Sequence, residues 1–221
     1  KYNLKTIYKI SQKLDYSDLL NLDDLDDIFS NQGIFTNDNI GKFVGHIIYK
    51  KYKYKNISLQ KFYDLTNIHF VCKVYNLSQK CDEYFSYETH PNLKVSELVK
   101  MTTCIPFFFK PIQYSNKYYI DGGVLCVMPF IEKYKNYLGI YIHEDIDKNI
   151  KDMDTFEYIT YINSCLTQKC KLNIDKNKES KIIQIHTKIL PCINFDVCLN
   201  DKKILKECGY DQTIIHINKY L

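Results

Sequence analysis

A chain of 221 residues is long enough for one sizeable domain, and its 45% hydrophobic and 14% aromatic content excludes the intrinsically disordered class. The formal net charge is +4, but Lys and Asp/Glu are interspersed, which favours a weakly basic solvated surface over a nucleic-acid partner. No apolar run reaches the length of about 18 residues that a membrane span needs.

The nine cysteines are an odd number, contain no Cys-x-x-Cys pair and lie in apolar segments. This pattern is typical of reduced, buried thiols in a cytosol-like compartment, and it indicates neither a disulfide framework nor a zinc site. We therefore expect a cytoplasmic protein whose contact with membranes, if any, is peripheral.

Apolar residues recur at helical spacing in several segments. The spacing predicts amphipathic helices over residues 1–14 and 40–48, a short helix that Ser58 caps, and further helices over 95–103 and 154–170. The C-terminal tail reads as two helical pieces broken at Gly209.

Five other segments are rich in β-branched and aromatic residues. Ile68–Leu77 is typical of a buried strand, and Glu83–Tyr87 of its hairpin partner or an edge strand. Three more short strands are expected at 118–120, 138–142 and 182–186. Because these strands alternate with helices, the sequence predicts an α/β layered sheet with right-handed crossovers.

Residues 102–130 hold the segment that points to chemistry. The expected strand 118–120 delivers Asp121 to its C-terminal end, where open α/β sheets place their sites. Gly122 and Gly123 follow and allow a sharp turn, and we expect at least one of them at positive φ. An Asp-Gly-Gly sequence alone is most often only a turn.

The block before Asp121 makes the pattern specific. The sequence resembles the patatin-like phospholipase family, whose members carry a small residue-Ile-Pro-x-x-Phe-x-Pro segment before an Asp-Gly-Gly motif and a Pro shortly after. The matching residues are Ile105, Pro106, Phe109, Pro111, Tyr119, Asp121, Gly122, Gly123 and Pro129. The resemblance extends over nearly the whole chain, although Cys126-Val127 replaces an Asn that the family usually has.

The resemblance implies a three-layer α/β/α sandwich and a Ser-Asp dyad that needs neither a metal nor an organic cofactor. A serine in a Gly-x-Ser-x-Gly elbow would attack the ester carbonyl, and Asp121 would accept its proton. In this chain Gly41 and Gly45 have the right interval, but Phe43 stands between them. We therefore expect residues 1–221 to be one patatin-like domain lacking its N-terminal nucleophile-elbow portion, with that portion upstream of Lys1.

Three groups of residues have alternative interpretations. In one interpretation the phenylalanines 107–109 are core residues, and in the other they form the wall of an acyl-chain groove. These residues are Phe107, Phe108 and Phe109. Cys104 is better explained as a small buried residue than as a nucleophile. The Lys/Tyr-rich stretch 49–55 reads as a solvated helix end or as a contact for phospholipid headgroups.

The sequence thus favours a lipid acyl hydrolase acting on a lipid, with phospholipid the leading substrate. A catalytically inactive relative that binds lipid or a protein through the same cleft is the first alternative. A nucleic-acid-binding module is the second, and the absence of a recognised motif or charged stripe speaks against it.

Overall fold

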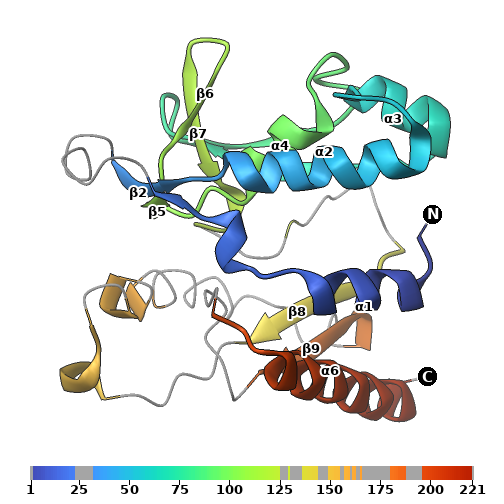
Figure 1. The fold of residues 1–221 in the computed structure, drawn as a ribbon, viewed down its shortest axis with the longest axis vertical. Helices are drawn as coiled ribbons and strands as arrows, with labels where there is room; N and C mark the ends of the chain where they lie inside the picture. Colours follow the sequence, from blue (N-terminus) through green and yellow to red (C-terminus); the bar gives the residue numbers. More distant parts are fainter. Residues whose placement is uncertain are drawn as a thin grey trace. The chain divides into compact units, whose positions relative to one another are not determined.

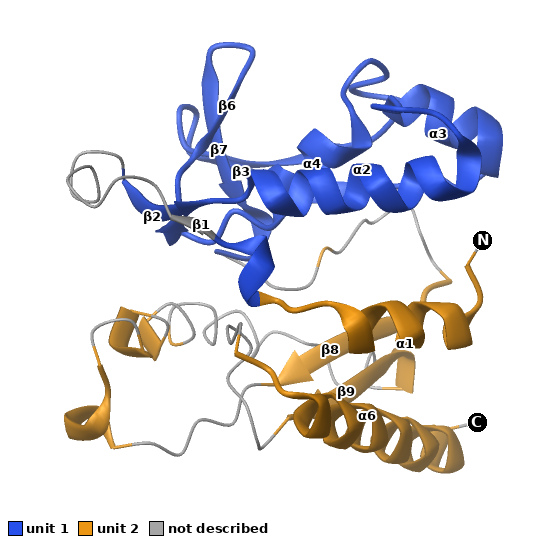
Figure 2. Cartoon of the chain, in the orientation of Figure 1, with its two compact units in different colours: residues 1, 17–125 blue, residues 2–16, 126–221 orange. Residues whose placement is uncertain are grey.

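The structure is a computed structural model of the 221-residue chain, drawn as a ribbon in Figure 1. It describes residues 2–22, 32–124, 129, 136–143, 149–154, 157–159, 161–162, 165, 180–187 and 196–220. The chain divides into two compact units: residues 1 and 17–125 form unit 1, and residues 2–16 and 126–221 form unit 2 (Figure 2).

The helices of unit 1 lie where the apolar spacing predicts them. They are α2 (Asp38–Tyr52), α3 (Leu59–Thr66) and α4 (Val95–Thr102), with a short 3-10 helix, η1 (Ser17–Leu19), before them. Ser58 caps α3 as expected, because its hydroxyl accepts a hydrogen bond of 3.2 Å from the backbone N–H of Lys61.

A four-stranded sheet in unit 1 contains the strand that carries Asp121. Its strands follow the order β4 (Cys81–Phe85), β3 (Cys72–Asn76), β7 (Lys117–Asp121) and β6 (Ile112–Tyr114), and every neighbouring pair is antiparallel. A second sheet contains β1 (Asn21–Leu22), β2 (Gly33–Thr36) and β5 (Phe107–Phe109), with β2 parallel to β5.

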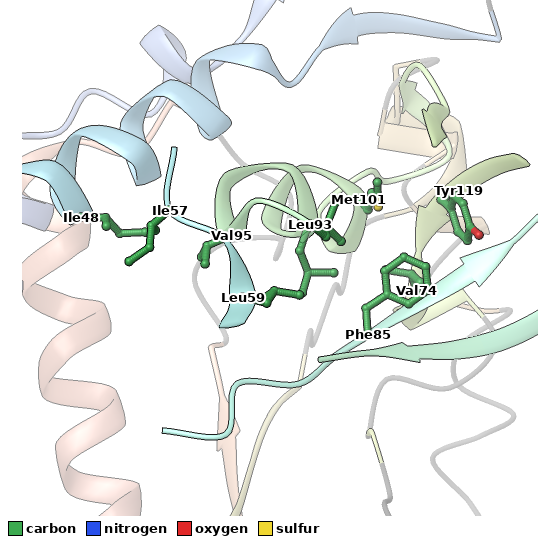
Figure 3. Packing of buried hydrophobic residues seen from close by; sticks show 10 residues of the cluster. Ile48, Ile57, Leu59, Val74, Phe85, Leu93, Val95, Met101 and Tyr119 are labelled. Atoms are coloured by element: carbon green, nitrogen blue, oxygen red, sulfur yellow. The ribbon is translucent and has the colours of Figure 1, made fainter. Parts of the chain in front are cut away.

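The core of unit 1 lies between its helices and the four-stranded sheet (Figure 3). Helix α4 contacts both α2 and β3, and the ring of Phe85 from β4 meets that of Tyr119 from β7 edge-on at 5.3 Å. The cluster contains Ile48, Ile57, Leu59, Val74, Phe85, Leu93, Val95, Leu98, Met101 and Tyr119. Burial of these apolar side chains fixes β7, and therefore the position of Asp121.

Unit 2 contains α1 (Leu4–Lys13), β8 (Gly139–His143), η4 (Ile150–Asp152), β9 (Ile182–His186) and α6 (Leu199–Tyr220). Strands β8 and β9 are parallel, and α6 packs on β9. Gln212 on α6 anchors this packing, since its Oε1 accepts a 2.8 Å hydrogen bond from the backbone N–H of His186.

Gly209 does not break the C-terminal helix, and that prediction is wrong. Helix α6 runs through it for 22 residues. A glycine inside a helix costs only about 1 kcal/mol relative to Ala, which tertiary packing offsets. Gly209 faces β9: a Cβ placed on it would lie 3.9 Å from Cδ1 of Ile185.

The fold is therefore α/β, with helices and both parallel and antiparallel strand pairs, as the alternation predicts. The sheet around Asp121 departs from the expectation of parallel strands joined by crossovers. Most of the helix expected over 154–170 lies outside the described residues. Among the helices in the described part, none is long and apolar enough to cross a membrane.

Candidate active site at the end of strand β7

A tight hairpin sets the direction of β7. Ser115 and Asn116 both have positive φ, 48° and 60°, and they join Tyr114 to its cross-strand partner Lys117. Two consecutive positive φ values match the right-handed twist of the two strands. Along β7 the buried residues Tyr119 and Ile120 then precede Asp121, which is the last residue of the strand, as predicted.

The glycines after Asp121 behave differently from the prediction. Gly122 and Gly123 form the short 3-10 helix η3 (Gly122–Val124), and neither has positive φ. Glycine is needed at position 122 because η3 lies very close to β3: a Cβ on Gly122 would be 2.5 Å from the carbonyl carbon of Lys73. The absence of a side chain lets η3 pack directly on the neighbouring strand.

The backbone around Asp121 orients its carboxylate. Its N–H donates a 2.8 Å hydrogen bond to the carbonyl of Cys104, and its Oδ1 accepts a 2.7 Å hydrogen bond from the N–H of Gly123. Among the described residues, Oδ2 has no hydrogen-bond partner, and no serine hydroxyl bonds to either oxygen. One oxygen of the carboxylate is thus fixed, and the other is available to a further group.

Burial raises the pKa of Asp121 from 3.8 to about 6. The hydrogen bond from Gly123 and the positive charge of Lys73 oppose this shift, since both favour the ionised form. At neutral pH the group is therefore a carboxylate that is more basic than an ordinary Asp side chain.

Lys73 is a residue of this site that the sequence does not single out. It is 7% exposed, lies on β3 next to the partner of Asp121, Val74, and its Nζ forms an ion pair of 2.9 Å with Asp82. A lysine within the apolar strand pattern Phe70–Val74 is the signal that could have identified it, because a buried charge needs a partner.

Two thiols lie near Asp121, the buried Cys104 and the partly buried Cys72, and neither has the character of a nucleophile. Burial raises the pKa of Cys104 to about 12, and the negative charge of Asp121 adds to the shift. Burial also raises the pKa of Cys72 to about 12, against a hydrogen bond with Thr102. Since the thiolate is the reactive form, these groups are inert at neutral pH, and Cys104 packs in the core below Asp121.

The three phenylalanines before this motif form β5. Phe108 and Phe109 are buried, with ring centroids 4.7 Å apart, and Phe108 also packs against Phe35 on β2 at 4.8 Å. Phe107 is 62% exposed, with a φ of 66°. Core packing thus describes Phe108 and Phe109, and Phe107 alone of the three presents a ring to solvent.

The remaining candidate positions do not join this site. Gly41, Phe43 and Gly45 lie inside α2, so their spacing belongs to a helix and not to a strand-to-helix elbow. Over the part of the chain that the structure describes, no group of three or more His, Cys, Asp or Glu residues could hold a metal ion. Cys126 and Val127 lie outside the described residues.

The sequence of the chain is similar to those of two viral proteins. Over 116 residues the chain is 30% identical to "Probable lipid hydrolase 463L" of Invertebrate iridescent virus 6, an alignment covering 50% of this chain and 40% of the viral protein. It is 24% identical over 235 aligned positions to "Uncharacterized protein R571" of Acanthamoeba polyphaga mimivirus, covering 94% of this chain and 73% of that protein. The chain therefore spans less than half of the length of the probable lipid hydrolase.

Among solved structures, VipD from Legionella pneumophila has a similar fold, with a TM-score of 0.53 at 17% identity, over 74% of this chain and 35% of VipD. A sequence profile of the family described as patatin-like phospholipase matches residues 2–132, which include α1 and the whole Asp121 site. The chain therefore belongs to the patatin-like phospholipase family.

Proposed function

We propose that Asp121 is the proton-accepting half of a Ser-Asp dyad that hydrolyses the acyl ester of a lipid. The observation that carries this proposal is the state of its carboxylate. Oδ1 is held by the N–H of Gly123, Oδ2 has no hydrogen-bond partner among the described residues, and the pKa is raised to about 6. A general base works best when its pKa lies near the working pH.

In the proposed reaction the serine Oγ attacks the ester carbonyl carbon, and its proton moves to Oδ2 of Asp121. The resulting acid then returns the proton to the alcohol that leaves when the acyl-enzyme forms. Water hydrolyses this intermediate in a second cycle of the same steps and releases a fatty acid. The fixed Oδ1 keeps the carboxylate in one orientation throughout, so little reorganisation accompanies each transfer.

We place the nucleophilic serine, with its Gly-x-Ser-x-Gly elbow, outside these 221 residues. The reason is that the seven glycines of the chain nowhere flank a serine at the required spacing. Membership of the patatin-like phospholipase family and the similarity to a probable viral lipid hydrolase support a lipid substrate, and phospholipid is the leading class. The exposed ring of Phe107 is suited to contact an acyl chain.

An esterase assay tests the proposal. The 221-residue chain should show no turnover of a short-chain chromogenic ester, because loss of a covalent nucleophile typically lowers the rate by about six orders of magnitude. A longer polypeptide that also includes the segment encoded immediately upstream should hydrolyse it. Turnover by the shorter chain that survives removal of Asp121 would contradict the proposal. An inactive longer polypeptide would favour the catalytically inactive, lipid-binding relative.

A further inference from the structure

One segment of unit 1, which includes most of helix α2, carries positive charges only. Residues 39–63 contain six lysines and neither Asp nor Glu, so this segment carries a charge of +6. The rest of the chain has 24 lysines and 26 acidic residues and is therefore net negative, although the chain as a whole is +4. The interspersed pattern of the full sequence thus hides one strongly basic segment.

In the structure this segment comprises most of α2, the connection to α3 and the first half of α3 (Figure 1). We define the Lys/Tyr surface as the exposed residues Lys42, Tyr49, Lys50, Lys53, Tyr54, Lys55 and Lys61. The Nζ atoms of Lys53 and Lys55 each lie 5.9 Å from the ring centroid of Tyr49, and that of Lys61 lies 5.2 Å from the ring of Tyr54. Cations and aromatic rings are therefore interleaved.

Three acidic groups, close to this surface in sequence or in an adjoining pocket, have other partners. Asp38 and Glu97 both bind the Nζ of Lys100, at 2.7 and 3.3 Å, and Asp64 accepts a hydrogen bond of 2.8 Å from Gln60. In the described part of the chain, no ion pair neutralises a lysine of the Lys/Tyr surface. Its positive charge is thus directed to solvent.

A pocket of about 460 Å³ adjoins the surface, and Lys42, Gly45, Tyr49 and Lys55 are part of its lining. Lys100 also lines it, together with the two carboxylates that pair with this lysine, Asp38 and Glu97. It is open partly because Gly45 has no side chain: a Cβ on this glycine would meet no atom of the described residues within 4 Å. The volume is in the range of small-molecule sites, which is about 300–1,000 Å³. By its volume the pocket is therefore large enough for one phosphorylated headgroup, and Lys42 and Lys55 are the unpaired cations in its described lining.

We propose that the Lys/Tyr surface docks unit 1 on an anionic phospholipid bilayer. Lysines near an anionic leaflet are attracted by its surface potential, and tyrosine rings favour the headgroup level of the interface. Tyr49 and Tyr54, which are 39% and 46% exposed, have the position to enter that level while the surrounding lysines contact phosphates. The choice of a bilayer over another polyanion rests on the proposed lipid hydrolysis.

The absence of tryptophan from the chain allows a direct test. Tyr54→Trp introduces a single indole on the Lys/Tyr surface without disturbing the core. With vesicles containing phosphatidylserine, its fluorescence should shift to shorter wavelength at low salt and return on addition of salt. Pure phosphatidylcholine vesicles should leave it unchanged. Since no ester is turned over, the result is independent of the proposed catalysis.

Matched charge variants in the Tyr54→Trp background complete the experiment. Lys50→Gln, Lys53→Gln and Lys55→Gln together should weaken partitioning onto phosphatidylserine vesicles roughly 100-fold, about fivefold for each lysine. The control removes three exposed lysines elsewhere, Lys9, Lys80 and Lys203, and should change partitioning less than about fivefold in total. The proposal would be overturned if both triple variants lost the same partitioning, or if the indole responded equally to phosphatidylcholine or not at all to phosphatidylserine. Tighter binding to a duplex oligonucleotide at equal phosphate concentration would also overturn it.

Discussion

One lysine and one glycine near the end of strand β7 are buried and in close contact with neighbours, whereas several lysines and one glycine along helix α2 and just after it are exposed or lie in open space. Beside Asp121, Lys73 is 7% exposed and paired with Asp82, and Gly122 touches the backbone of the next strand. On the Lys/Tyr surface, Lys53 and Lys55 are exposed, and in the neighbouring pocket no atom of the described residues lies within 4 Å of the Cβ position of Gly45.

This difference indicates how each region can act. Around Asp121 the carboxylate, the glycines and Lys73 are fixed by neighbours, so a change of one group alters the geometry or the charge of the site. At the end of α2 the proposed role depends on the sum of several exposed charges, and each contributes little alone. Single substitutions should therefore have large effects in the first region and small effects in the second.

The largest expected effect is that of Asp121→Asn on catalysis. In a polypeptide that contains the nucleophile, this substitution should lower turnover of a chromogenic ester about 10²- to 10⁴-fold, because it removes the proton acceptor and preserves the shape. The matched control is Asp64→Asn on the exposed face of α3, which should leave turnover within about twofold. Full activity of the Asp121→Asn variant would assign the base to another group.

The same substitution should stabilise the fold at neutral pH, which can be measured on the 221-residue chain alone. The pKa of Asp121 in the folded chain, about 6, lies above its ordinary value of 3.8, so the folded chain holds this proton more tightly. The free energy of unfolding therefore falls by roughly 3 kcal/mol as the pH rises from about 4 to above 6.

Asp121→Asn should remove this loss. The free energy of unfolding of the variant should therefore be up to roughly 3 kcal/mol higher than that of the original chain at pH 8, and the two should be equal near pH 3.5. Urea unfolding at the two pH values measures the difference. Asp64→Asn serves again as the control. If Asp121→Asn destabilised the chain at pH 8, the carboxylate would be better stabilised in the folded state than the burial of Asp121 indicates.

Many of these features could be predicted from the sequence. The apolar spacing predicted helices over residues 40–48 and 95–103, which the structure has as Asp38–Tyr52 and Val95–Thr102. The Ile105-Pro106 block with Asp121-Gly122-Gly123 identified the strand end and the family. These features depend on local residue patterns and on a specific motif, and such patterns can be recognised in a single sequence.

Other features depend on contacts between distant segments. The role of Gly122 follows from the approach of β3, which lies about fifty positions earlier in the chain, so the motif alone suggested positive φ instead of close packing. The burial of Lys73 likewise depends on its partner Asp82 across the β3–β4 hairpin. The Lys/Tyr-rich stretch 49–55 within the basic segment 39–63 was recognised in the sequence, but the sequence alone left open whether it is a solvated helix end or a contact for headgroups.

Gly122→Ala tests the close packing beside Asp121. The added Cβ would lie 2.5 Å from the carbonyl carbon of Lys73, and this carbonyl group is anchored by a 2.8 Å hydrogen bond from the Thr102 hydroxyl. We expect a loss of about 1–3 kcal/mol in the free energy of unfolding, since either the strand or η3 must move. Gly209→Ala in α6 is the control and should not destabilise the chain, because among the described residues the new Cβ would meet only Cδ1 of Ile185, at 3.9 Å. A neutral Gly122→Ala would mean that β3 and η3 are less closely packed.

The smallest effect, and the opposite sign, is expected for Gly45→Ala on α2. This glycine is inside the helix, and its Cβ position is open, so Ala should raise the free energy of unfolding by about 0.5–1 kcal/mol through helix propensity alone. Gly41→Ala, one turn earlier, is the matched variant: its Cβ would lie 2.6 Å from Cδ of Lys100, which binds Asp38 at 2.7 Å, so part of the gain should be lost. Urea unfolding of both variants measures the difference.

Because Gly45→Ala leaves every lysine of the Lys/Tyr surface in place, partitioning onto phosphatidylserine vesicles should stay within about twofold. A large loss of partitioning would mean that the pocket beside Gly45, and not the summed charge of the surface, dominates the interaction with the bilayer.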